Sequence, residues 1–404
     1  MTAANPRVGR GAGRSAKKSR RRSTGLQKRS SHSVNRKGAE KRPVGYDGFL
    51  LVGTLLLIGI GVVMVYSASS VIAEERFSSD AYFFKRQVAY ALVAILALIL
   101  CRHVPYGLYR KMAYPILASA FLLVLAVFIP GVGHAVGGAK RWIRMAGFTF
   151  QPSEFAKLAM IIYLAYSMSK KQGKLKVFSI GVLPHAIVCG SLGVIVLMQP
   201  DFGTAALLAL IAWTMLFVGG VRLSNLLGGV VAVLPVAYYI LIHAGYRMRR
   251  IQGFLDPWKY ESDAGYQVVH SLMAFGSGGI MGTGLGMSYQ KLFYLPEPHT
   301  DFIFSVLAEE LGLVGVCFVL GLYALILWRG IVIAMRAMDL FATYLTVGLV
   351  AAIGLQVCVN LGVAMGLLPT KGLTLPFISY GGTSLVMNAA AIGILMNISA
   401  REKG

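Results

Sequence analysis

Charged residues are scarce in this sequence. They make up 14% of its 404 residues, whereas hydrophobic residues make up 56%. Soluble domains contain about 25% charged and about 45–50% apolar residues, so this composition excludes an ordinary soluble enzyme, a disordered protein and a collagen-like fibre. The mean hydropathy of +0.66 agrees with that exclusion. Such a composition indicates a polytopic membrane protein.

Cysteine is also scarce. The four cysteines, Cys101, Cys189, Cys317 and Cys358, lie in or beside apolar runs, and none forms a CxxC pair. This pattern favours neither a disulfide framework nor a zinc site. The sequence therefore indicates no metal centre and no certain cofactor, although it leaves open whether a divalent cation assists.

Acidic residues are scarce as well. The sequence contains 39 Lys and Arg but only 16 Asp and Glu, which gives a net charge of +23. Residues 1–46 contain 14 basic residues and one acidic residue, so this tail carries +13. Because it has almost no large apolar side chains, we expect it to be disordered and not cleaved as a signal peptide. A basic arm could bind nucleic acid. A basic segment directly before an apolar run better fits a cytoplasmic tail beside anionic lipids, without a nucleic-acid partner.

Apolar runs of membrane-spanning length follow the tail. Taking about 20 residues per span, we count ten, near residues 47–69, 85–101, 112–130, 153–169, 177–198, 202–220, 223–243, 302–328, 341–366 and 381–400. An even number places both termini on one side, and the basic tail predicts that this side is the cytoplasm. This orientation leaves 26 of the 39 Lys and Arg residues on the cytoplasmic side. The predicted fold is an all-α polytopic membrane protein with about ten transmembrane helices over residues 47–400.

Two connections on the outer side are long. They cover about residues 131–152 and about residues 244–301, and the second is a large extracytoplasmic loop between spans 7 and 8. Long connections without an obvious helical pattern are uncommon unless they are functional. We therefore expect any chemistry on the outer face.

Ionisable residues within the spans need a partner or a task. Glu154 and Lys157 open the fourth span on one helix face, with Ser153 as the expected N-cap. An internal ion pair and a functional role are both consistent with this spacing, and the two can coexist. Asp201, in the turn before the sixth span, is interpreted as a helix cap rather than a catalytic group.

Cations and glycines gather in the two long connections. Arg141 and Arg144, in the segment GGAKRWIR, reach the outer interface, where they could anchor to headgroups or bind a pyrophosphate. The second connection is crowded with glycines: Gly276, Gly278, Gly279, Gly282, Gly284 and Gly286. Since no strand–turn–helix context surrounds them, they do not indicate a nucleotide site. We expect them to allow tight turns and close packing.

The densest polar segment, YLPEPHTDFIFSVLAEEL, ends the long outer loop and begins the eighth span. It contains His299, Thr300 and Asp301, and Thr300 or Asp301 could cap the helix. Glu309 and Glu310 lie two turns deeper. Three carboxylates within ten residues are more than a cap requires.

A second polar segment, LPTKGLTLPFISYGGTSL, lies at the outer end of the last two spans. It offers Lys371, Ser379 and Tyr380 together with several glycines. Both polar segments are expected on the outer side, where we expect the chemistry.

Six motifs carry a resemblance to a known family: GAKRWI, QPSEFAKL, MQPDFGTA, SLMAFGSGG, YLPEPHTDFIFSVLAEELG and LPTKGLTLPFISYGGTS. In this order along ten spans, they resemble the SEDS (shape, elongation, division and sporulation) family over about residues 47–400. Several are more similar to the motifs of the cell-division members than to those of the elongation members. Gly137 stands where division members often have Asn, and Ala308 where Gly is usual; neither departure removes a functional group.

The resemblance implies a peptidoglycan glycosyltransferase that polymerises lipid II for septal cell-wall synthesis. It implies a multi-pass protein of the bacterial plasma membrane, expected at the division septum. The implied partners are a class b penicillin-binding protein, which supplies transpeptidation, and other membrane proteins of the division machinery.

The resemblance also assigns roles to residues. The family's catalytic Asp matches Asp301, its polar cavity residues match Glu154 and Lys157, and the Lys of its last outer loop matches Lys371. The remaining candidates for substrate binding are Arg141, Arg144, His299 and Ser379.

The implied reaction suits these residue types. Lipid II carries an α-linked disaccharide on a pyrophosphate, and polymerisation forms a β-1,4 bond, so the anomeric centre inverts. One base is needed to take the proton of the acceptor hydroxyl. Because the pyrophosphate leaves as a stable anion, the second carboxylic acid of glycoside hydrolysis is not needed. Positive charge must face the developing diphosphate, which an outer-face Asp with Lys and Arg nearby can provide.

Two other functions are compatible with this composition. A flippase or other transporter of lipid II would also contain intramembrane Glu and Lys. However, the hydropathy pattern contains no inverted repeat, and the charged residues cluster at the outer face. A non-catalytic division scaffold would not need Asp301 at a lipid-accessible entry.

Overall fold

The computed structural model describes residues 45–401 except 137–138, 146–147, 243–244 and 293–297. All but the last two residues of the expected tail, 1–46, lie outside the described residues. The helices are α1 (Gly48–Phe77), α2 (Tyr82–His103), α3 (Tyr106–Lys111), α4 (Ala113–Ala126), α5 (Pro152–Lys170), α6 (Leu183–Met198), α7 (Phe202–Val218), α8 (Leu223–Ile242), α9 (Gly245–Leu255), α10 (Tyr266–Gly278), α11 (Ile303–Arg336), α12 (Leu340–Ala364) and α13 (Gly382–Ser399). The 3-10 turn η1 (Gln172–Lys174) and the π-helical turn η2 (Phe178–Val182) join α5 to α6. Each of the ten predicted apolar runs overlaps one of these helices.

Six helices of the described chain are long and apolar enough to cross a membrane. They are Gly48–Phe77, Tyr82–His103, Phe178–Met198, Ile303–Arg336, Leu340–Ala364 and Gly382–Ser399. Shorter apolar helices cover Ala113–Ala126, Phe202–Val218 and Leu223–Pro235. The prediction of a helical, multi-pass membrane protein is confirmed, whereas the count of ten spans stays a prediction.

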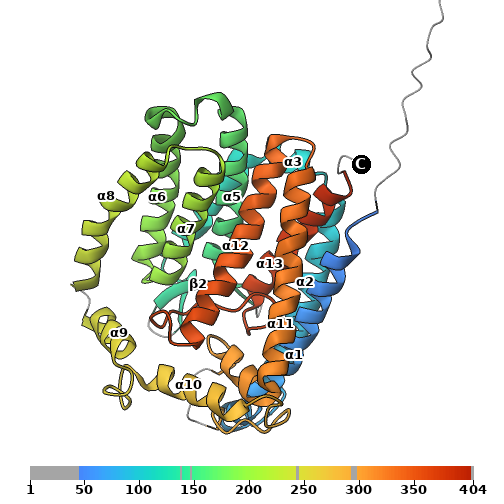
Figure 1. The fold of residues 1–404 in the computed structure, drawn as a ribbon, viewed down its shortest axis with the longest axis vertical. Helices are drawn as coiled ribbons and strands as arrows, with labels where there is room; N and C mark the ends of the chain where they lie inside the picture. The colour runs from blue at the N-terminus through green and yellow to red at the C-terminus, as the bar shows by residue number, and fades with distance from the viewer. Residues whose placement is uncertain (1–44, 137–138, 146–147, 243–244, 293–297, 402–404) are drawn as a thin grey trace, which may run out of the picture. The chain divides into compact units, whose positions relative to one another are not determined.

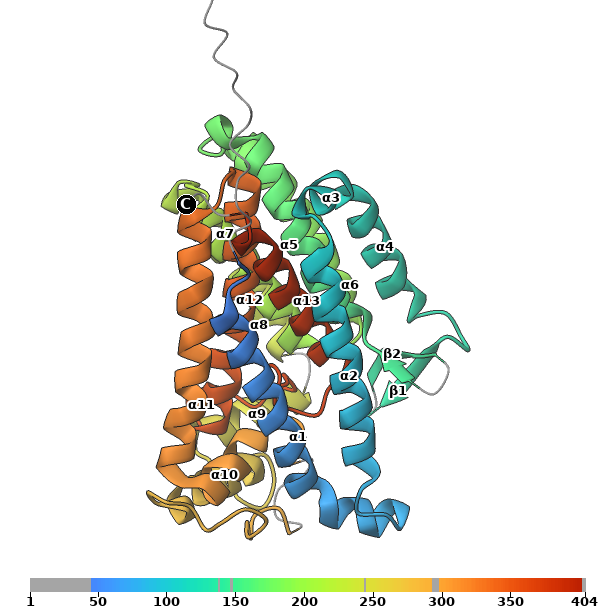
Figure 2. The same ribbon diagram turned by 90° about the vertical axis from the view of Figure 1, so that its right-hand side faces the viewer.

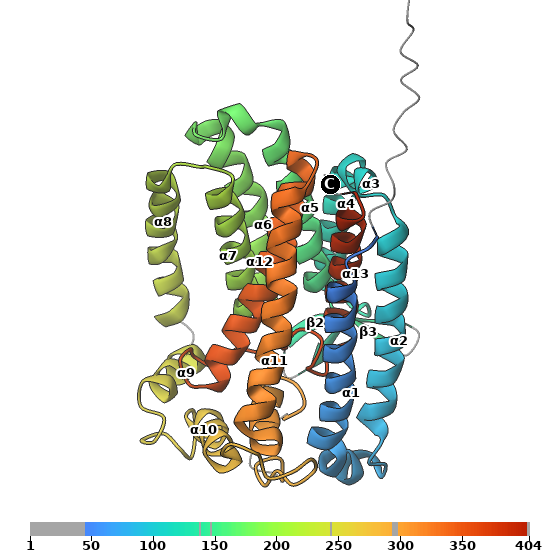
Figure 3. The same ribbon diagram turned by 45° about the vertical axis from the view of Figure 1, so that its right-hand side comes forward.

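Helix α13 lies inside the bundle. Sixteen of its 18 residues are buried, and Figures 2 and 3 show it between α12 and α2. Small residues allow this close packing. A Cβ atom at Gly393 would collide with the carbonyl oxygen of Leu98, and one at Gly382 would collide with the ring of Tyr90. The helix therefore gives a rigid support to the loop that precedes it, residues 365–381.

The connection between α4 and α5 contains a small antiparallel sheet, so the all-helical prediction is wrong for this segment. Its strands are β1 (Gly133–Val136), β2 (Ala139–Met145) and β3 (Phe148–Phe150), in the order β1-β2-β3. In β2, Ala139 and Ile143 are buried whereas Lys140 and Arg144 are exposed. This alternation has the period of two that a half-buried strand requires. The segment is too short and too charged to continue a membrane helix.

The connection expected at 244–301 contains α9 and α10, which were not predicted as helices. After α10 the chain turns tightly, with positive φ angles at Gly279, Gly282, Gly284 and Gly286. A Cβ atom at Gly282 would collide with the carbonyl group of Glu310 in α11. The expectation of tight turns is confirmed at these four glycines, and the expectation of close packing is confirmed at Gly282.

Helix α11 is interrupted by one residue with non-helical backbone angles, Gly312, whose φ is +62°. At this φ a side chain would be strained, and a Cβ atom would collide with the backbone of Gly282. The interruption separates a short first segment, Ile303–Leu311, from the longer remainder of α11. Asp301 lies two residues before the start of that short segment.

The two ends of the described chain lie at one end of the bundle. The backbone N–H of Asp47 donates to the hydroxyl of Ser399 at 3.3 Å, and Arg329 forms an ion pair of 2.6 Å with Asp47. We call this the termini end. Helices α9 and α10 lie at the opposite end, the loop end (Figure 1). All described helices belong to the compact unit Pro43–Gly404.

Candidate active site

Asp301 lies in the segment that leads into α11. The residue at the N-cap position of α11 is Phe302, whose side chain makes no capping hydrogen bond. Asp301 is half-buried, whereas His299 is almost completely buried. Neither Thr300 nor Asp301, the two residues expected as the cap, occupies the N-cap position of α11.

Three consecutive carbonyl groups before α11 accept hydrogen bonds. The N–H of Tyr380 donates to His299 at 2.9 Å, and the hydroxyl of Ser379 donates to Thr300 at 2.6 Å. The side-chain amide of Asn360, on α12, donates to the carbonyl of Asp301 at 3.1 Å. The backbone at Asp301 is thus held by α12 and by the loop 365–381, which were expected to share its site.

The carboxylate of Asp301 lies beside the same loop. A Cβ atom built on Gly372 would be 3.5 Å from Oδ2 of Asp301. Gly372 is exposed and directly follows Lys371. The two polar segments singled out in the sequence therefore meet, and Asp301 and Lys371 lie on contacting segments.

Lys371 projects over the start of α7. Its ammonium nitrogen is 5.0 Å from the centre of the Phe202 ring, a distance typical of a cation–π contact. Burial lowers the pKa of Lys371 below the ordinary value for lysine. On the other side of the loop, Arg250 of α9 donates to the carbonyl of Thr370 at 3.5 Å. Arg250 was not singled out from the sequence, although it lies in a basic run, RMRR, of the outer loop.

Glu154 and Lys157 form the buried ion pair that their spacing predicted, with 2.9 Å between Oε2 and Nζ. Lys157 also donates to Oε1 of Gln356 at 2.6 Å, and Gln356 in turn donates to the carbonyl of Thr374 at 2.8 Å. Both charges of the pair are enclosed, so neither side chain lies open to solvent. The pair is thus linked to the loop 365–381 through Gln356, which bonds to both Lys157 and Thr374. Gln356 was not singled out from the sequence.

The expected N-cap of α5, Ser153, is wrong by two positions. Gln151 occupies the N-cap, and Pro152 begins the helix. Proline is favoured at the first helical position because its fixed φ suits the helix and its missing N–H is not needed there. Ser153 is therefore a buried residue of the first turn.

Arg141 contacts the turn between α6 and α7. Its guanidinium group donates to the carbonyl groups of Gln199, at 3.1 Å, and Pro200. It also lies 3.9 Å from Oδ1 of Asp201. Arg144, three residues further along β2, is exposed. Of the two candidate arginines, the structure thus gives Arg141 backbone partners and leaves Arg144 on the surface.

Asp201 caps α7, as its position predicted. Its carboxylate accepts hydrogen bonds from the N–H of Thr204 at 3.2 Å and from the hydroxyl of Thr204 at 2.8 Å. Burial raises the pKa of Asp201, and the charge of Arg141 opposes that effect. The cap fixes the start of α7, where Phe202 contacts Lys371.

His299 and Ser379, two candidates for substrate binding, have structural contacts. The ring of His299 packs 4.5 Å from the centre of Phe83 and 5.5 Å from that of Tyr380. Burial, with a smaller effect from Arg76, lowers the pKa of His299 to about 4, so the ring is neutral at neutral pH. Besides donating to Thr300, the hydroxyl of Ser379 accepts from the N–H of Leu375 at 2.8 Å.

Glu309 and Glu310 do not share a site with Asp301. Glu309 accepts hydrogen bonds from Ser288 and from the backbone N–H of Tyr289 at 3.0 Å. Glu310 pairs with Lys291 at 2.9 Å and accepts from Ser67 of α1 at 2.6 Å. These two buried carboxylates fasten the outer loop to α11 and α1. Glu309 and Glu310 therefore have structural partners of their own.

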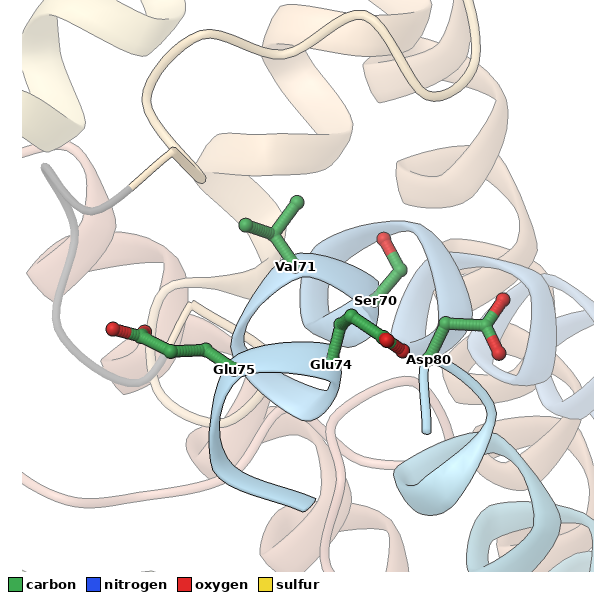
Figure 4. Close-up of a pocket in the computed structure, with 5 residues that line it drawn as sticks. All are labelled: Ser70, Val71, Glu74, Glu75 and Asp80. Atoms are coloured by element: carbon green, nitrogen blue, oxygen red, sulfur yellow. The ribbon is translucent and has the colours of Figure 1, made fainter. Parts of the chain in front are cut away.

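A separate cavity of about 490 Å³ lies at the junction of α1 and α2 (Figure 4). It is lined by Ser70, Val71, Glu74, Glu75 and Asp80. Three carboxylates would repel an anionic diphosphate. Its lining includes no residue of the segments around Asp301 and Lys371.

A family model described as "Cell cycle protein", covering FtsW, RodA and SpoVE, matches residues 49–404. The chain belongs to this family. The probable peptidoglycan glycosyltransferase FtsW of Geobacter metallireducens is 48% identical over 359 residues, which cover 89% of this chain and 96% of that protein. Stage V sporulation protein E of Bacillus subtilis is 42% identical over 353 residues, with 87% and 96% covered. The resemblance drawn from the six motifs is confirmed.

Solved structures of FtsW/RodA/SpoVE family members have the same fold. A chain from a structure of a peptidoglycan synthase complex, solved to explain how polymerization and crosslinking are coordinated, aligns with a TM-score of 0.73 and 29% identity. It covers 88% of this chain and 98% of that chain. The rod shape determining protein RodA of Thermus thermophilus aligns with a TM-score of 0.66 and 28% identity, covering 89% and 99%. The names of these relatives agree with the expected class of activity.

Proposed function

We propose that this protein is a peptidoglycan glycosyltransferase that polymerises lipid II into glycan strands for septal cell-wall synthesis. The observation that carries the proposal is the meeting of two segments. The carboxylate of Asp301 lies beside Gly372, and the loop that contains Gly372 also presents Lys371. A base and a cation are the two groups that this transfer needs, and relatives at up to 48% identity are named peptidoglycan glycosyltransferases.

Asp301 is the proposed general base. As the acceptor 4-hydroxyl attacks the anomeric carbon of the donor, Asp301 takes the hydroxyl proton. The bond between the anomeric carbon and the diphosphate oxygen breaks, and the diphosphate leaves with the bonding electrons. No second acid is required, which agrees with the enclosure of Glu154 in its pair with Lys157.

Lys371 is the proposed counter-charge for the leaving diphosphate. It is half-buried, and the carbonyl before it contacts Arg250, so two cations border this part of the loop. Positive charge fixed in a partly desolvated site stabilises a developing anion more than it would in water. The charge of Lys157 is already compensated by Glu154, so its proposed role is to hold the loop through Gln356.

We also propose the topology. The ten helices that overlap the predicted runs span the bacterial plasma membrane, with the termini end in the cytoplasm and the loop end outside. The basic tail, residues 1–46, is then cytoplasmic, and Asp301 and Lys371 face the outer leaflet, where the lipid tail of lipid II would keep its disaccharide. The large outer loop lies between spans 7 and 8, and the expected site of action is the division septum.

The proposed partners follow from the same activity. A class b penicillin-binding protein would crosslink the strands, in line with the similar synthase complex in which polymerization and crosslinking are coordinated. Other membrane proteins of the division machinery complete the expected set. The residues that the structure describes include no group of three or more His, Cys, Asp or Glu placed to hold a metal ion.

One assay tests the proposal against its alternatives. The purified protein and its penicillin-binding partner are placed in liposomes with fluorescent lipid II in one leaflet. Glycan polymer on a gel supports the glycosyltransferase. Translocation of lipid II without polymer would indicate a flippase, and neither product would indicate a scaffold.

A further inference from the structure

Asn360 connects the Asp301 segment with the Lys371 loop. It lies in the last turn of α12 and is 2% exposed. Its single amide nitrogen donates to two carbonyl oxygens, that of Asp301 at 3.1 Å and that of Leu373 at 2.7 Å. An amide nitrogen has two hydrogens, so both are used. One side chain thus joins two segments that are 72 positions apart in the sequence.

Asn360 bonds to a different backbone carbonyl from its neighbours Ser379 and Tyr380. Ser379 and Tyr380 bond to Thr300 and His299, upstream of the proposed base. Asn360 bonds to the backbone of Asp301 itself. On the other side it bonds to Leu373, two residues after Lys371. It is therefore placed to set the distance between the carboxylate and the ammonium group.

We propose that Asn360 is a positioning residue that holds the Asp301 carboxylate and the Lys371 ammonium group in the spacing that glycosyl transfer requires. The inference rests on the proposed function. A displacement of about 1 Å in an active site can lower the rate by about a hundredfold. Because Asn360 is buried and does not carry charge, its loss should affect the reaction step more than the binding of lipid II.

Asn397 provides a matched control. It is also buried, 5% exposed, and also joins distant segments: it donates to the carbonyl of Arg102 at 2.7 Å and accepts from the N–H of Tyr106 at 3.0 Å. It lies on α13 at the termini end, away from Asp301. Asn360→Ala and Asn397→Ala should therefore lose similar amounts of stability.

The first measurement compares the kinetics of polymerisation by the full chain with its penicillin-binding partner. We expect Asn360→Ala to lower kcat by about tenfold to a hundredfold with little change in KM. Asn360→Asp, which keeps the volume but not the two donors, should lose at least as much. Asn397→Ala should retain nearly wild-type kcat once the unfolded fraction is subtracted. Equal kcat values for the two alanine variants, or a loss confined to KM, would overturn the proposal.

The second measurement does not depend on activity. Hydrogen exchange in peptides covering residues 299–305 and 371–381 should be about tenfold faster in Asn360→Ala, the effect of losing about 1.4 kcal/mol of hydrogen bonding. Asn397→Ala should leave these peptides unchanged. Unchanged exchange in Asn360→Ala would refute the connection. If the wild type forms no polymer, the proposed function fails, and the exchange result alone then decides whether Asn360 joins the two segments.

Discussion

The hydroxyl of Ser379 lies 2.6 Å from the carbonyl oxygen of Thr300, and this contact joins the last outer loop to the segment before α11. The same hydroxyl accepts the N–H of Leu375 at 2.8 Å. Ser379 therefore fixes both its own loop and the residue adjacent to the proposed base. We therefore propose that Ser379 helps to place Asp301. From the sequence, Ser379 was predicted only as a candidate for substrate binding.

Breaking the Glu154–Lys157 pair should cost stability rather than abolish chemistry directly. Lys157→Met or Glu154→Gln alone leaves one buried charge without its partner, at a cost of about 3–5 kcal/mol. The double variant removes both charges and should recover much of that loss. Thermal unfolding in detergent, compared with lipid II turnover, tests this expectation. A single Lys157→Met variant with wild-type melting and lost turnover would instead indicate a direct role with the diphosphate.

The charge of Lys371 should limit activity at alkaline pH. Burial lowers its pKa, so the ammonium group present at neutral pH is lost at a lower pH than for an exposed lysine. Turnover should therefore fall as pH rises through this lowered pKa. Lys371→Arg, which stays protonated, should shift the fall to higher pH, even if its different shape lowers the maximum rate. A pH profile identical in both proteins would show that another group sets the alkaline limit.

Asp201 should tolerate substitution by asparagine. Asp201→Asn keeps a capping oxygen for the N–H of Thr204, and asparagine caps helices about as well as aspartate. The variant loses the charge contact with Arg141 at 3.9 Å and one acceptor oxygen, the one that accepts from the hydroxyl of Thr204 at 2.8 Å. We expect most of the polymerase activity to remain, measured as glycan product per folded protein. Complete loss would contradict the capping role and would place Asp201 in the chemistry.

The positions of the ten helices that overlap apolar runs could be predicted because apolar runs of membrane-spanning length depend on local sequence alone, whereas α9 and α10 were missed. The sheet could not, since the alternation of Ala139 and Ile143 with Lys140 and Arg144 covers only a few residues between two membrane helices. The start of α5 was misplaced because proline is favoured at the first helical position, so the helix begins at Pro152 and Ser153 lies inside its first turn.

Part of the site could also be predicted from local sequence, and part could not. Motifs identified Asp301 and Lys371, and their meeting follows from two outer loops on one side of the bundle. The orientation of the Glu309 and Glu310 side chains depends on partners that are distant in the sequence, such as Ser67. A local sequence pattern does not reveal such partners. Asn360 and Gln356 appear in the sequence only as single polar residues in an apolar run. Their hydrogen-bond partners can be identified only from the packing of α12 against the loop 365–381 and the Asp301 segment.

The central claim is that Asp301 is the base of a glycosyl transfer. Asp301→Asn keeps the size of the side chain and the backbone bond to Asn360, but asparagine cannot accept the proton of the acceptor hydroxyl. Losing a general base lowers the rate by about 10²–10⁴-fold. Phe302 rather than Asp301 occupies the N-cap position of α11, and asparagine caps helices about as well as aspartate, so the loss of a cap would not explain lost activity. The variant should therefore insert, melt and bind its penicillin-binding partner as the wild type does.

The most direct measurement is the glycan polymer formed from lipid II by purified Asp301→Asn with its partner, beside wild type in the same liposomes. We expect the wild type to produce long strands and the variant to produce none above background, with equal amounts of folded complex. Polymer from the variant at the wild-type rate would contradict Asp301 as the base.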